Sequence, residues 1–230
     1  MNSLLILHGA LGSSNQLLPL SNILKKDFNV YTLDFSGHGK KSNIDEDLSI
    51  ELFVNDIQEF LSKENITTPI NIFGYSMGGY VALLLASLYP EAVNKIFTLA
   101  TKFDWNEESS VKESKMLDAE KILDKVPHYA QMLSDRHGKD FWKNTCIKTA
   151  QLMLSLGKNP VLKDNILESI TCECIISVGA LDKMVSMDET KLVADKIKNA
   201  QFKLFENLEH PFEKIDYTLL REELIHFYNL

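Results

Sequence analysis

The strongest indication of the fold is in residues 70–85, which read Ile-Asn-Ile-Phe-Gly-Tyr-Ser-Met-Gly-Gly-Tyr-Val-Ala-Leu-Leu-Leu. Their pattern predicts a short buried strand, a sharp turn and then an Ala/Leu-rich helix. The turn carries Gly74-x-Ser76-x-Gly78, the arrangement that presents a nucleophilic serine between a strand and a helix. We expect both glycines to leave room for the helix to pass close to the strand, where a Cβ atom would clash. Ser76 would then lie at the helix N-terminus, whose free N–H groups favour nearby negative charge.

Composition limits the class of protein. The chain has 230 residues, of which 45% are hydrophobic and 24% charged, which is ordinary for a globular protein with one sizeable core. A net charge of −8 makes nucleic acid an unexpected partner. No membrane association is expected either, since the longest apolar run, residues 80–86, is well under half of a membrane span.

The cysteines suggest a compartment. The chain has an odd number of cysteines, Cys146, Cys172 and Cys174, and no recognisable signal peptide. We therefore predict reduced thiols in a cytoplasmic protein. No Cys/His cluster has the spacing of metal ligands. We therefore expect neither a metal nor a cofactor.

Strands and helices alternate along the chain. Runs of apolar residues, or segments bounded by turn-forming residues such as Gly and Pro, predict six strands, at residues 3–7, 28–35, 70–75, 93–99, 172–178 and 201–205. Helical spacing predicts helices between them, at residues 16–26, 50–63, 189–199 and 217–228 in addition to the one after Ser76. This alternation predicts an α/β three-layer sandwich with a mostly parallel six-stranded sheet.

One segment interrupts the alternation. Residues 102–169 contain no predicted strand, and instead predict helices at about 112–125, 128–137 and 139–156. We therefore divide the chain into a core, residues 1–101 and 170–230, and a helical insertion, residues 102–169. In parallel sheets of this kind ligands bind at the carboxyl ends of the strands. Ser76, Asp182 and His210 all follow predicted strands.

Five segments, in this order, resemble the α/β-hydrolase fold family across essentially the whole chain. They are His8-Gly9, residues 34–39, residues 74–79, residues 179–182 and His210. The order Ser, Asp, His is that of the family's catalytic triad. The chain departs from the family pattern in one respect, because the family usually has two strands before the His-Gly strand and here that strand is the first. We therefore expect a reduced core with the 28–35 strand at one edge of the sheet. The resemblance makes the helical insertion a cap over the site.

The resemblance also implies roles for individual residues. Ser76 would be the nucleophile, His210 its general base, and Asp182 the acid that orients the base. The backbone N–H groups of Ala10 and Met77 would form the oxyanion hole.

Four other residues bear on that assignment. Asp104, after the fourth strand, is a rival for the triad acid. We expect His8 and His38 to hold loops by hydrogen bonds rather than to react. Glu209 stands where the family commonly has Gly before the catalytic histidine, which adds a negative charge there.

The insertion predicts the character of the substrate pocket. It is rich in Met and aromatic residues, most of which would serve packing. The remainder would line an apolar pocket, and a strongly anionic substrate is not expected because Arg136 is the one arginine of the insertion. The candidate pocket residues are Leu11, Phe103, Trp105, Trp142 and Met153.

The leading functional hypothesis is a serine hydrolase that cleaves a small carboxylic ester through an acyl-enzyme. A C–C bond hydrolase or a lyase could use the same triad, and a non-catalytic ligand-binding member of the fold is a further alternative. Haloalkane dehalogenase chemistry would need a carboxylate where Ser76 stands. The expected partner is a small ester-like molecule, and the oligomeric state stays open.

Overall fold

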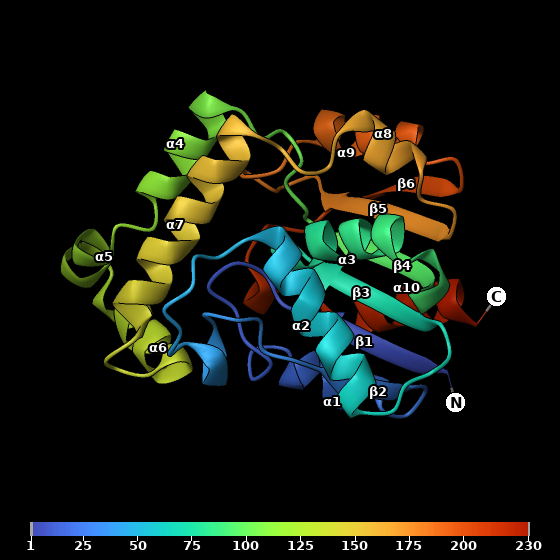
Figure 1. Ribbon diagram of the computed structural model, residues 1–230, viewed down its shortest axis with the longest axis horizontal. Coiled ribbons are helices and arrows are strands. Elements are labelled where there is room, and N and C mark those ends of the chain that lie inside the picture. Colours follow the sequence, from blue (N-terminus) through green and yellow to red (C-terminus); the bar gives the residue numbers. More distant parts are fainter. Residues whose placement is uncertain (1, 230) are drawn as a thin grey trace.

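The computed structural model describes residues 2–229 and contains one six-stranded sheet (Figure 1). The strand order is β2-β1-β3-β4-β5-β6, and every neighbouring pair is parallel. The predicted α/β class is confirmed, and the sheet is parallel throughout. The strands are β1 (Ser3–Leu7), β2 (Asn29–Thr32), β3 (Ile70–Tyr75), β4 (Val93–Leu99), β5 (Glu173–Gly179) and β6 (Ala200–Phe205).

Helices cover both faces of the sheet, which completes the three layers. On one face α2 (Ile50–Lys63), α3 (Met77–Leu88) and α9 (Met187–Lys196) contribute to one hydrophobic cluster with side chains of β1 and β3. On the other face α1 (Leu18–Leu24) and α10 (Tyr217–Tyr228) pack against alternate side chains of the same strands. The central strand β3 is buried at all six positions, which explains its continuous apolar run.

The edge strand β2 is shorter than predicted, because residues 33–35 leave the sheet. The Phe35 N–H donates to His8 Nε2 at 3.1 Å instead of pairing with β1. The next residue, Ser36, donates its N–H to Asp56 of α2 at 2.7 Å. The chain therefore leaves the edge of the sheet near the carboxyl end of β1.

The insertion forms a separate group of helices beside the carboxyl ends of the strands (Figure 1). It contains α4 (Glu107–Lys115), α5 (Ala119–Lys125), α6 (Pro127–His137) and α7 (Trp142–Lys158). The helix predicted at 112–125 is two helices, because the chain breaks before Asp118, whose carboxylate caps α5 by accepting from the Lys121 N–H at 3.1 Å. The last helix of the segment, α8 (Asp164–Glu168), packs against α3 and α9 of the core.

The structure also bears on membrane insertion. Within residues 2–229, no helix has both the length and the apolar character that a membrane span requires.

Candidate active site

Ser76 stands at a strained turn between β3 and α3. Its backbone has φ 51° and ψ −118°, a conformation that costs free energy for any residue with a side chain. The turn is held by two hydrogen bonds, from the Ser76 N–H to Leu99 O at 2.8 Å and from Thr101 Oγ1 to Ser76 O at 2.9 Å. Such strain persists where neighbouring structure imposes it, and here the neighbours present the serine side chain to a cavity that it lines.

The glycines around Ser76 are required by close packing. A Cβ added to Gly74 would lie 2.5 Å from Gly79 Cα, so no side chain fits between β3 and the start of α3. A Cβ on Gly78 would lie 2.6 Å from the carbonyl oxygen of Leu7 in β1. The Gly-x-Ser-x-Gly pattern thus follows from the approach of a helix to two adjacent strands.

Asp182 and His210 are brought together from loops after β5 and β6. Asp182 Oδ2 lies 2.7 Å from His210 Nδ1, and the Asp182 side chain is fully buried. The other carboxylate oxygen, Oδ1, accepts the N–H groups of Met184 at 2.8 Å and Val185 at 2.9 Å. Because a carboxylate accepts and does not donate, the imidazole carries its proton on Nδ1 and keeps a lone pair on Nε2. This is the tautomer that a general base for serine needs.

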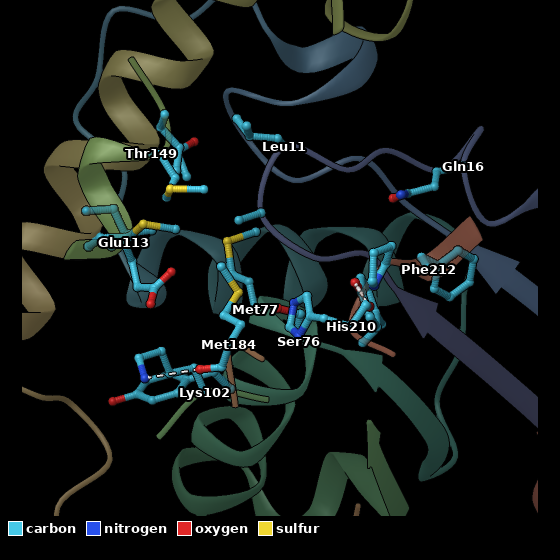
Figure 2. Close-up of a pocket in the computed structure, with 18 of the residues that line it drawn as sticks. Leu11, Gln16, Ser76, Met77, Lys102, Glu113, Thr149, Met184, His210 and Phe212 are labelled. Carbon is cyan, nitrogen blue, oxygen red and sulfur yellow. Dashed lines mark hydrogen bonds between the residues drawn. The ribbon is translucent and has the colours of Figure 1, made fainter. Parts of the chain in front are cut away.

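The position of His210 is fixed from the core as well. Its carbonyl oxygen accepts a hydrogen bond from Tyr75 Oη at 2.7 Å. His210 and Ser76 line the same cavity, and Figure 2 shows them in the same part of its wall. The fold therefore gathers Ser76, His210 and Asp182 at one end of the sheet although they are far apart in the sequence.

Neither Asp104, the rival for the triad acid, nor Glu209 forms the contact with the His210 ring that Asp182 makes. Asp104 is exposed, and its carboxylate accepts a hydrogen bond from Asn106 Nδ2 at 3.1 Å near the start of α4. Glu209 pairs with Lys214 Nζ at 2.7 Å on the surface, where its charge is already neutralised. The geometry thus favours Asp182 as the partner of the histidine.

Two backbone N–H groups are available for an oxyanion. Met77 provides the first N–H of α3, and Ala10 follows His8-Gly9 at the end of β1. Both residues line the cavity, and neither amide donates a hydrogen bond to any residue between 2 and 229. An unpaired N–H at a helix N-terminus is suited to bind developing negative charge.

His8 holds the loop that carries Ala10. Its Nε2 accepts the Phe35 N–H, so its Nδ1 carries the proton and donates to Gly9 O at 2.8 Å. Burial, as the main cause, lowers the pKa of His8 to about 3, so the ring is neutral at ordinary pH. The loop-holding geometry expected for this residue is present, and His38 makes a similar contact with Ser36 O at 3.1 Å.

The cap also contacts this loop, through two residues of α6. His137 of α6 accepts the Gly39 N–H on Nδ1 at 2.9 Å and donates from Nε2 to Leu11 O at 3.0 Å. Arg136 Nη1 donates to the same carbonyl at 2.6 Å. The cap therefore fixes the residue next to Ala10. No sequence signal marks these residues beyond their place at the end of a predicted helix.

The rings of His8, His38 and His137 form a buried histidine cluster. Their centroids are 5.3 Å apart for His8 and His38 and 5.8 Å apart for His38 and His137. Burial is the largest cause that lowers the pKa of His38 to about 4 and that of His137 to about 3. The cluster joins the core to the cap as a set of neutral rings.

A cavity of about 790 Å³ lies between the core and the cap, and Ser76 and His210 line it (Figure 2). Of the residues predicted for the pocket, Leu11, Trp105 and Met153 are on its wall. Phe103 and Trp142 are not. Phe103 stacks against the Tyr80 ring, and Trp142 is buried in the hydrophobic cluster inside the cap, so both are packing residues.

Comparison with known proteins agrees with this geometry. A family profile described as the alpha/beta hydrolase fold matches residues 2–120, just over half of the chain. The human protein named serine hydrolase BPHL is 24% identical over 215 residues, which cover 91% of this chain and 73% of that protein.

Two solved structures are similar in fold. A thermophilic esterase from Thermogutta terrifontis has a TM-score of 0.79 at 17% identity, covering 100% of this chain and 90% of that one. The enol-lactonase from Burkholderia xenovorans LB400 has a TM-score of 0.76 at 16% identity, covering 100% of this chain and 92% of that one. The chain belongs to the α/β-hydrolase fold family and is an α/β-hydrolase enzyme.

Proposed function

We propose that this enzyme cleaves small carboxylic esters through an acyl-enzyme formed on Ser76. The observation that carries the proposal is the 2.7 Å contact between Asp182 Oδ2 and the Nδ1 of His210, a residue that lines the same cavity as Ser76. It leaves His210 Nε2 as the group that can accept the serine proton. The names of the similar proteins, a serine hydrolase, an esterase and a lactonase, favour the same type of reaction.

In the proposed reaction, His210 Nε2 takes the proton of Ser76 Oγ as the oxygen attacks the ester carbonyl. The N–H groups of Ala10 and Met77 stabilise the charge that develops on the carbonyl oxygen. His210 then returns its proton to the leaving alcohol, and the acyl group stays on Ser76. In the second half-reaction His210 takes a proton from a water molecule, whose oxygen attacks the acyl carbonyl; the bond to Ser76 Oγ breaks, His210 gives the proton to that oxygen, and the acid is released.

Labelling with a fluorophosphonate probe tests this proposal directly, together with hydrolysis of p-nitrophenyl esters of graded acyl length. We expect the probe to label Ser76 and the wild-type enzyme to hydrolyse short esters with a burst of p-nitrophenol. Ser76→Ala should abolish labelling and lower turnover by about 10⁶-fold, as removal of a triad nucleophile does. Retention of activity within tenfold of wild type would remove Ser76 from the mechanism.

A further inference from the structure

Glu113 of α4 is a carboxylate in the wall of the active-site cavity. Its side chain is 6% exposed, and Figure 2 shows its oxygens directed into the cavity. Across residues 2–229 its carboxylate accepts no hydrogen bond, whereas its backbone carbonyl accepts the Met116 N–H within the last turn of α4. Its one ion pair there is with Lys112, whose Nζ is 3.9 Å away on a side chain that is 73% exposed. Glu113 is thus a nearly buried charge with a weak partner.

Burial of such a carboxylate makes the free energy of folding less favourable. A buried carboxylate is stable when hydrogen bonds or an opposite charge replace the water that it has lost. The other charged groups on the cavity wall do not supply this. Lys102 Nζ is 3.5 Å from Met184 O and 3.9 Å from Glu189 Oε1, and Arg136 binds Leu11 O and Glu213. Lys214, the third cation of the wall, pairs with Glu209, and among residues 2–229 none of these three cations forms an ion pair with Glu113.

Another buried polar group lies on the same wall. Thr149 of α7 is fully buried and lines the cavity, and its hydroxyl has no hydrogen-bond partner among the described residues. The helices α4 and α7 pack against each other, and Figure 2 shows Thr149 and Glu113 on adjoining parts of the cap. A carboxylate with one weak ion pair and a hydroxyl with no partner, on adjoining helices, indicate a place where a ligand supplies the hydrogen bonds.

We propose that Glu113 binds a protonated amine or a guanidinium group of the substrate, at the end remote from the scissile ester. An ionised carboxylate can only accept hydrogen bonds, and a cationic N–H donor is its strongest complement. Met77, which Figure 2 shows between Glu113 and Ser76, and other apolar residues that line the cavity suit a hydrocarbon spacer. The substrate class is therefore an ester with an apolar chain that ends in a cation. This inference rests on the proposed esterase function.

The test compares matched p-nitrophenyl esters whose chains end in an ammonium or in a methyl group, over four to eight carbons. At the best length we expect the wild-type enzyme to prefer the ammonium ester. Glu113→Gln should lower that preference by about 10- to 100-fold, the value of one charge-assisted hydrogen bond. The loss should appear mainly in KM, since the contact is made in ground and transition state alike.

Glu108→Gln is the matched control, because Glu108 is an exposed carboxylate on the same helix. It removes the same charge and should leave the preference unchanged. An equal preference in wild type and Glu113→Gln, with the methyl esters still hydrolysed, would overturn the assignment of Glu113 and leave the esterase function intact. Failure to hydrolyse any ester would instead count against the proposed function.

Wild-type enzyme alone offers a second measurement, which does not depend on the folding of a variant or on turnover. Hexylammonium should stabilise the protein in thermal melts at lower concentration than 1-hexanol or hexanesulfonate does. If hexanol stabilises it equally well or better, Glu113 does not bind a cation.

Discussion

Replacing Asp182 with asparagine tests the triad through the hydrogen bonds of a single side chain. In the structure, Oδ1 accepts two backbone N–H groups and Oδ2 contacts His210 Nδ1. An asparagine can keep the two backbone bonds only by placing its carbonyl oxygen at the Oδ1 position. Its NH₂ group then faces Nδ1 and can donate to it, so the imidazole must carry its proton on Nε2 instead.

That tautomer cannot accept the proton of Ser76. The opposite orientation of the amide would direct its NH₂ against the N–H groups of Met184 and Val185 and lose both hydrogen bonds, at about 1–3 kcal/mol for each unsatisfied buried group. We therefore expect Asp182→Asn to keep its fold and to lower kcat by about 10⁴-fold, the loss that a wrong histidine tautomer causes in triads.

The assay is steady-state hydrolysis of a p-nitrophenyl ester, with a thermal melt of each variant beside it. Asp104→Asn is the matched control, because Asp104 is exposed and contacts Asn106 rather than a histidine. If Asp182→Asn keeps its activity within tenfold of wild type, or if Asp104→Asn loses a comparable amount of activity, the assignment of Asp182 as the triad acid is wrong.

Three further predictions concern the cap and the histidine cluster. Arg136→Met should lower kcat about tenfold, because Leu11 O next to Ala10 loses a charge-assisted hydrogen bond; Arg221→Met, whose arginine pairs with Asp27, should leave kcat unchanged. Met153→Ala should change the preferred ester length by up to about a hundredfold, whereas Trp142→Ala should lower the melting temperature and all ester activities together. The clustered histidines, with pKa values of about 3 to 4, take up protons more readily once unfolded. The free energy of unfolding should therefore fall below pH 6.5 by up to about 1.4 kcal/mol per pH unit for each histidine. Urea titrations at pH 7 and pH 5 measure this, with exposed His226→Gln as the control; equal stability at the two values would contradict it.

Features that depend on local sterics and on chain order can be predicted from the amino-acid sequence alone. The turn at Ser76 needs glycine at 74 and 78 because backbone atoms lie within 2.6 Å of any Cβ there. The apolar runs of β1 and β3 follow from strands covered on both faces. The order of Ser76, Asp182 and His210 after successive strands is also visible in the chain, because parallel strands bring their carboxyl ends to one edge.

Which side chains contact one another could not be predicted without the three-dimensional fold. Asp182 rather than Asp104 contacts His210 because the loops after β5 and β6 are neighbours, whereas Asp104 lies on the surface at the start of the cap. The orientation of the cap helices placed Trp142 in packing and Glu113 in the cavity wall. Periodicity shows that a helix has an inner face, but not whether that face meets other helices or an open pocket. This depends on contacts between segments far apart in the chain.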